Sequence, residues 1–99
     1  MSNAVLFVSF KLKKGASVPD FLLAAEKLNN EYMSKQKGYI SWKQLFDGKT
    51  WADFITFETM DDAKKVAKPS DTNDLAKKFY SFINLFSCKM HLFSVEKSY

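Results

Sequence analysis

The run GYISWKQLFDGKTWADFITFETMDDA, residues 38–63, decides the predicted fold of this chain. Residues 39–46 and 51–57 are rich in aromatic and β-branched side chains, which favour strands because they pack well on a pleated, half-buried surface. The dipeptide Asp47-Gly48 between them is typical of a tight hairpin turn, since both residue types tolerate left-handed backbone conformations. Thr59, three residues before an acidic side chain, matches a helix-start pattern in which the hydroxyl accepts a free backbone N–H. The run therefore predicts strand, turn, strand and the start of a helix.

The residues before this run predict one strand and one helix. In residues 4–12, apolar side chains recur at every second position, which is the pattern of a strand. Ser17 and Pro19 mark a helix start, because a Ser can cap a helix and the missing N–H of a Pro costs nothing in the first turn. We expect this helix to reach Lys35. Its apolar face comprises Phe21, Ala25, Leu28 and Tyr32.

The residues after the run predict two helical pieces and a last strand. A short helix is expected over residues 60–68, and Pro69 ends it because a proline disfavours helical geometry in the residue before it. A second helix is expected to begin near Thr72 or Asn73, and residues 86–97 are expected to form the last strand. The apolar stripe of the second helix comprises Leu75, Phe79 and Phe82, with Phe86 as an optional last member.

This order of elements predicts an α+β fold in a single domain, residues 1–99. Two interleaved β-α-β units give a ferredoxin-like β-α-β-β-α-β arrangement, an antiparallel sheet with helices on one face. In a monomer, the sheet face opposite the helices should be polar. Here both faces are largely apolar, since Leu6, Val8 and Phe10 alternate with Val5 and Phe7 on the first strand, and Trp51, Ile55 and Phe57 alternate with Ala52 and Phe54 on the third. Because a large exposed apolar patch normally marks an interface, we expect a homodimer in which two sheets pack face to face.

Composition favours a cytoplasmic protein. The sequence contains no apolar run of about 18 residues and no signal-peptide pattern, so neither a membrane span nor secretion is predicted. Its single cysteine, Cys88, cannot form an intramolecular disulfide, which fits a reducing compartment. The net charge of +4 comes with lysines and no arginine. Since Arg makes the bidentate contacts to phosphate and guanine, solvated surface explains this charge better than nucleic-acid binding does.

The length, the order of elements and the run GYISWKQLFDGKTWADFITFETMDDAKK resemble the antibiotic biosynthesis monooxygenase-like (ABM-like) domains of the dimeric α+β barrel superfamily. In that group, a first strand ending in a Gly leads into a long helix, and a Gly-aromatic pair opens the hairpin. The second hairpin strand ends in an aromatic residue followed by acidic residues and Ala, as in residues 57–63. The resemblance covers residues 4–96 and implies a dimeric α+β barrel. That scaffold hosts cofactor-free oxygenases, haem-degrading enzymes, isomerases and proteins with no assigned reaction.

The resemblance implies a function without a cofactor. Haem-degrading and quinone-forming members rely on a polar first-strand residue, a Trp late in the third strand and a His or Arg from the helical region. The corresponding positions offer Ser9, Phe57 and neither His nor Arg, so haem chemistry is not expected. What remains is a cofactor-independent monooxygenase acting on a small aromatic or quinol-like substrate, which needs chiefly an apolar pocket with a few polar groups. The alternative is a non-catalytic small-molecule-binding or assembly module on the same dimeric scaffold.

Two titratable residues are candidate catalytic groups. His91, the only histidine, could shuttle protons from a barrel-lining position, or it could be a strand histidine at the dimer face. Asp53 lies mid-strand among aromatic residues and could act as an acid or base, or it could be a structural partner for Lys43. Candidates for the lining of a pocket are Trp42, Trp51, Tyr32, Tyr80, Phe57 and Ser9, although aromatic strand residues are alternatively core residues. No His, Cys or carboxylate cluster has metal-ligand spacing, so no metal site is expected.

A second family with this topology is the RNA-recognition motif. The run Leu6-Phe7-Val8-Ser9 resembles its first-strand signature, and residues 51–57 carry aromatic side chains where RNA bases would stack. Alignment on Phe57, however, places Ala52 where an aromatic residue is required. It also places Asp53 at a small-residue position, where its charge would repel phosphate. We therefore predict no nucleic-acid partner.

Overall fold

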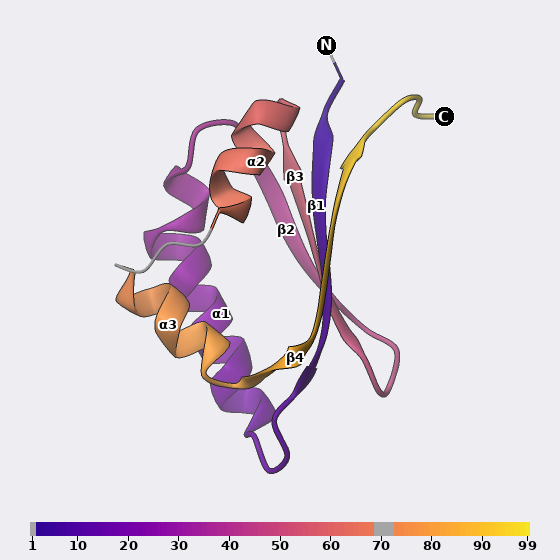
Figure 1. The fold of residues 1–99 in the computed structure, drawn as a ribbon. Helices are drawn as coiled ribbons and strands as arrows, with labels where there is room; N and C mark the ends of the chain where they lie inside the picture. The colour runs from indigo at the N-terminus through magenta and orange to yellow at the C-terminus, as the bar shows by residue number, and fades with distance from the viewer. Residues whose placement is uncertain (1, 69–72) are drawn as a thin grey trace.

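A four-stranded antiparallel sheet carries the helices on one of its faces (Figure 1). The computed structural model describes residues 2–68 and 73–99. In chain order, its elements are β1 (Ala4–Leu12), α1 (Val18–Glu31), a 3₁₀ turn (Met33–Lys35), β2 (Tyr39–Phe46), β3 (Trp51–Phe57), α2 (Met60–Ala67), α3 (Asp74–Tyr80) and β4 (Ile83–Ser94). The strands lie in the order β2-β3-β1-β4, and every neighbouring pair is antiparallel. The predicted α+β, ferredoxin-like sheet is confirmed.

Each α-helix in the described residues begins at a side chain that caps its first turn. Ser17 accepts a hydrogen bond from the backbone N–H of Asp20 at 3.3 Å. Thr59 accepts one from the N–H of Asp62 at 3.1 Å. Asn73 does the same for α3, so the predicted start of that helix at Asn73 is confirmed, whereas Thr72 lies outside the described residues. These caps satisfy backbone donors that a helix start otherwise leaves free, which explains why such local signals predicted the starts well.

The first helix ends earlier than the sequence predicts. It stops at Glu31 instead of Lys35, because Tyr32 leaves helical geometry at φ −136°. The chain then forms the 3₁₀ turn, and this turn directs the side chain of Met33 into the core. The side-chain amide of Gln36 donates to the carbonyl of Tyr32 at 3.1 Å and holds the turn. The short helix α2 likewise ends at Ala67, one residue before the predicted end.

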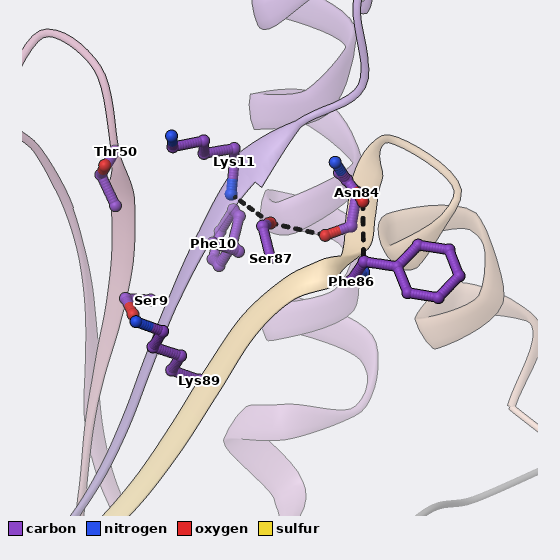
Figure 2. Close-up of a pocket in the computed structure, with 8 residues that line it drawn as sticks. All are labelled: Ser9, Phe10, Lys11, Thr50, Asn84, Phe86, Ser87 and Lys89. Atoms are coloured by element: carbon purple, nitrogen blue, oxygen red, sulfur yellow. Dashed lines mark hydrogen bonds between the residues drawn. The ribbon is translucent and has the colours of Figure 1, made fainter.

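The last strand differs most from its prediction. It runs over Ile83–Ser94 instead of residues 86–97, and Phe86 belongs to no helical stripe. Between two regular stretches of pairing with β1, residues 85–88 stand opposite the single residue Phe10 and form a bulge. This bulge leaves the side chain of Phe86 fully exposed, pointing away from β1 in Figure 2.

Hydrogen bonds from side chains fix the bulge. The hydroxyl of Ser87 accepts from the backbone N–H of Lys11 at 2.8 Å and donates to the carbonyl of Asn84 at 2.6 Å (Figure 2). The side-chain oxygen of Asn84 accepts from the backbone N–H of Phe86 at 3.2 Å. Polar side chains thus replace ladder bonds that the inserted residues cannot make.

The core lies between the sheet and the helices and is centred on Phe21. The ring of Phe21 meets Phe10 edge-on at 5.9 Å and Trp51 edge-on at 5.2 Å, and it stacks on Phe79 at 5.2 Å. Phe21 therefore joins α1 to β1, β3 and α3. Other fully or nearly fully buried members include Leu6, Leu28, Ile55, Phe57, Ala63 and Ile83.

The opposite face of the sheet has no helix against it in the described parts of the chain (Figure 1). The pairing register places Val5, Phe7, Ala52, Phe54 and Phe93 together on that face. Polar side chains lie around them on β2 and β4, namely Ser41, Lys43, Lys89 and His91. Among the helices of the described residues, none is both long and apolar enough to cross a membrane.

We predict that Gly38→Ala destabilises the protein more than Gly15→Ala does. Both glycines have φ +80°, which costs a residue with a side chain about 1 kcal/mol. A Cβ at Gly15 would meet nothing within 4 Å, whereas a Cβ at Gly38 would lie 2.6 Å from Cγ of the buried Asp62. Denaturant titration should therefore show an extra loss of about 1–3 kcal/mol for Gly38→Ala. Equal losses for the two variants would contradict the close packing of Asp62 under Gly38.

Candidate functional site

A cavity of about 690 Å³ opens between the sheet and the helices. Its size is in the range that holds drug-sized ligands. Side chains of the sheet, α1, α2 and α3 form it, and most of them are apolar. The aliphatic and aromatic part of the lining includes Leu6, Val8, Leu28, Met33, Trp42, Ile55, Val66 and Phe79.

A buried carboxylate, that of Asp53, lies in this apolar lining. Side chains alternate along β3, so Asp53 shares the helix-facing side with Trp51, Ile55 and Phe57, and it is only 5% exposed. The indole Nε1–H of Trp42 donates to Oδ1 of Asp53 at 3.0 Å, and the Nε2–H of Gln44 donates to the same oxygen at 3.4 Å. Gln44 stands directly opposite Asp53 in the β2–β3 register.

The second oxygen of Asp53 is available to a ligand. Both hydrogen bonds go to Oδ1, and no donor among the described residues bonds to Oδ2. In the described residues, every fully enclosed polar side-chain atom has a hydrogen-bond partner. Since Oδ2 has none, it is not fully enclosed. Since Asp53 lines the cavity, Oδ2 is the oxygen that can accept a proton from a bound molecule.

Burial has the largest effect on the pKa of this carboxylate. It raises the pKa of Asp53 from the ordinary value of 3.8 to about 7, while the hydrogen bonds from Trp42 and Gln44 lower it. Near neutral pH, the protonated and ionised forms are therefore both populated, which is the condition under which a carboxylate works well as a general base or acid.

The charge of this carboxylate also affects the pKa of two further groups, Tyr80 and Cys88. Partial burial raises the pKa of Tyr80, and the charges of Asp53 and Cys88 add to the effect. Burial also raises the pKa of the Cys88 thiol, with a smaller contribution from Asp53. The phenol of Tyr80 therefore stays a hydrogen-bond donor at physiological pH beside the cavity that it lines.

The structure brings together four of the eight residues that the sequence singled out. Asp53, Trp42, Tyr32 and Tyr80 all line the cavity. Trp51 and Phe57 are core residues, 9% and 0% exposed, and do not belong to the lining.

The remaining two candidates, Ser9 and His91, lie on the opposite face of the sheet. His91 pairs with Phe7 and is exposed, and its ring stacks on Phe93 at 5.7 Å. Ser9 lines a separate hollow of about 430 Å³ beside the bulge of β4, together with Lys11 and Lys89 (Figure 2). The titratable side chains among the described residues of this hollow are two exposed lysines.

Lys43 is not the structural partner of Asp53. It stands opposite Phe54, one residue away, and successive strand residues point to opposite faces. The actual partners, Trp42 and Gln44, follow from the same register. Gln44 is the residue that sequence reasoning missed, although the predicted strand ends at Phe46 and Trp51 place it opposite Asp53 when the pairing is counted back from them.

Metal ligands are not gathered anywhere in the described residues. No group of three or more His, Cys, Asp or Glu side chains lies together there. The cavity itself contains one carboxylate among its described lining residues, Asp53.

Comparison with solved structures finds the same fold in proteins of low sequence identity. SnoaB, a cofactor-independent oxygenase from Streptomyces nogalater, matches with a TM-score of 0.76 at 11% identity over 99% of this chain and 97% of its own. A protein from Bacillus cereus described as a candidate antibiotic biosynthesis monooxygenase matches with a TM-score of 0.64 at 16% identity, over 100% and 98%. A dimeric protein of unknown function and ferredoxin-like fold from Bacteroides fragilis matches with a TM-score of 0.63 at 18% identity, over 94% and 96%.

The fold alone does not determine the reaction. A hydroxynitrile lyase from Passiflora edulis also matches, with a TM-score of 0.67 at 15% identity over 98% of this chain and 96% of its own. No family model and no curated protein matches the sequence. Function must therefore be argued from the cavity and its residues.

We predict that Asp53→Asn stabilises the protein more at about pH 8 than at about pH 5. The pKa of Asp53 is higher in the folded protein than in the unfolded chain, so the unfolded state releases the proton first and stability falls as pH rises from 3.8 to about 7. An Asn does not titrate. The increase in the free energy of unfolding caused by Asp53→Asn should therefore be about 2–3 kcal/mol larger at the higher pH. Chemical denaturation at both pH values measures it. A gain of the same size at both would contradict the raised pKa, which ¹³C NMR of the carboxyl group can test directly.

Proposed function

We propose that this protein is an ABM-like, cofactor-independent oxygenase that acts on a small aromatic or quinol-like molecule bound in the cavity. The observation that carries the proposal is the carboxylate of Asp53, buried in an apolar wall with Oδ2 free and a pKa of about 7. A poised base in an apolar cavity suits the removal of a weakly acidic proton from an aromatic substrate. SnoaB supports the proposal as an oxygenase with the same fold.

The chemistry needs the base, the substrate and O₂. Oδ2 of Asp53 takes a proton from the substrate, and the anion that remains is delocalised over the aromatic rings. In anthrone, for example, the ionised carbon forms a C–O bond with O₂, and Asp53 returns its proton to give a hydroperoxide. The hydroperoxide carbon then loses its remaining C–H proton while the O–O bond breaks and releases hydroxide, so that water leaves and the C=O bond of the quinone forms. The carbon is oxidised, O₂ is reduced, and one oxygen atom ends in the product and the other in water.

The walls of the cavity fit this type of substrate. Trp42 and Phe79 meet edge-on at 5.6 Å, and both line the cavity with Tyr32 and Tyr80. Aromatic surfaces favour flat ligands, and the phenol of Tyr80 can donate to a carbonyl or phenolate oxygen. Because most of the lining is apolar, a substrate that fills the cavity would displace water from it, and its anion would then be protected from competing protonation.

A homodimer is part of the same proposal. The sheet face without helices has an apolar centre formed by Val5, Phe7, Phe54 and Phe93, with polar side chains at its margins. An apolar centre with a polar rim is the usual anatomy of an interface. The side chain of Phe93 is 53% exposed in the single chain, so a second copy packed on this face would remove it from water.

We predict that Asp53→Asn lowers the rate of anthrone oxidation by about 100-fold or more, since that is the typical contribution of a general base. Oxygen consumption and quinone absorbance measure the rate. Asp62→Asn is the matched control, because Asp62 is equally buried but does not line the cavity. If the wild-type protein binds anthrone in the cavity without turnover, the binding-module alternative is correct instead.

We predict that Phe54→Lys converts the dimer into a monomer, because a charge at the centre of the apolar face cannot be buried against a second sheet without a partner. Light scattering should give twice the monomer mass for the wild type and the monomer mass for the variant. Leu22→Lys, at an exposed position on α1, is the control and should leave the mass unchanged. A monomeric wild type at micromolar concentration would rule out the sheet-face dimer.

A further inference from the structure

We propose that the ligand of this cavity is an aromatic carboxylate, whose rings lie against the apolar wall and whose anionic group binds to lysines at the opening. This inference rests on the proposed function only in taking the cavity as the ligand site. It concerns a part of the site that the proton transfer to Asp53 does not use.

The lysines come from three separate segments, and all of them line the cavity. Lys13 follows β1, Lys68 follows α2 and Lys77 lies on α3, and all three are exposed while lining the cavity. The backbone N–H of Lys13 donates to the carbonyl of Phe82 at 2.8 Å, which ties the end of β1 to the turn after α3. The topology therefore holds Lys13 next to the segment that follows Lys77.

The charge at the opening is not balanced by the acid inside. Asp53 is the one carboxylate among the described lining residues, and it is buried, whereas the lysines are exposed. Burial raises the pKa of Asp53, and the hydrogen bonds from Trp42 and Gln44 lower it. The positive charges and Asp53 thus act on different parts of a bound molecule.

This separation selects an amphipathic ligand. A flat apolar body can reach the wall formed by Trp42, Phe79 and Tyr80, while a carboxylate at one end stays at the opening, half in water. An ammonium or a guanidinium at that end would meet like charge from three lysines. A fully neutral ligand would leave the lysines unused, and in that case they would be ordinary solvated surface.

The test compares two probes of nearly equal shape, 2-naphthoate and the neutral ketone 2-acetylnaphthalene. Calorimetric titration at about pH 6 keeps most of Asp53 protonated, so its charge does not oppose the acid. We expect 2-naphthoate to bind about tenfold more tightly at low salt, and we expect the difference to shrink at high salt because the lysines are exposed. Lys13→Gln and Lys77→Gln should each weaken 2-naphthoate about two- to fivefold and leave the ketone unchanged.

The location of the probes is checked by the two indole N–H signals in ¹H–¹⁵N spectra. The Trp42 signal should shift on binding because that N–H lies at the cavity, whereas the Trp51 signal from the core should not. Lys64→Gln, an exposed lysine of α2 outside the lining, is the control and should bind both probes as the wild type does.

The possible negative results contradict different parts of the proposal. Equal affinity for the two probes, or a preference for 2-naphthoate that survives both lysine substitutions, would overturn the carboxylate inference. The oxidation of neutral anthrone would still test the proposed function. Absence of any shift of the Trp42 signal with either probe would overturn the cavity as the ligand site, and the proposed function would fall with it.

Discussion

Burial of one carboxylate on a central strand is the constraint on which the site depends. β3 alternates its side chains, so the same two-residue period that sends Trp51, Ile55 and Phe57 into the core also sends Asp53 there. A buried charge is costly unless it is hydrogen-bonded or neutralised. The protein does both: donors from β2 bind one oxygen, and the raised pKa keeps the group partly protonated near neutrality. The hairpin that decides the fold therefore also builds the candidate site.

Local signals predicted the fold, and tertiary contacts caused the errors. Helix starts at Ser17 and Thr59 depend on a side chain and a backbone group three residues apart, so the sequence contains all that is needed. The end of α1 depends on a distant core that accepts Met33, and no local pattern encodes that. The bulge at residues 85–88 is similar, because the hydrogen bond from the backbone of Lys11 to Ser87 joins residues far apart in the sequence.

The site was predictable by residue type but only partly by position. Asp53 was a candidate because a carboxylate among aromatic residues is costly unless it is paired or has a function. The structure places it in the lining of the cavity. Assigning Lys43 as its partner ignored the period of the strand, which a count across the hairpin turn would have corrected to Gln44. The cavity itself arises from how α2 and α3 sit over the sheet, so the contributions of Lys13 and Lys77 were not visible in the sequence.

The irregular pairing on β2 and β4 has a further consequence, since these are the two outer strands of the sheet. An outer strand with a regular row of unpaired backbone N–H and C=O groups can pair with a strand of another chain, which leads to aggregation. On β4 the inserted residues 85–88 interrupt that template, and on β2 the register shifts around Ile40. Both outer strands are thus bent away from regular ladder geometry. In this way a protein with much apolar β-sequence is protected against growth into fibrils from the edges of its sheet.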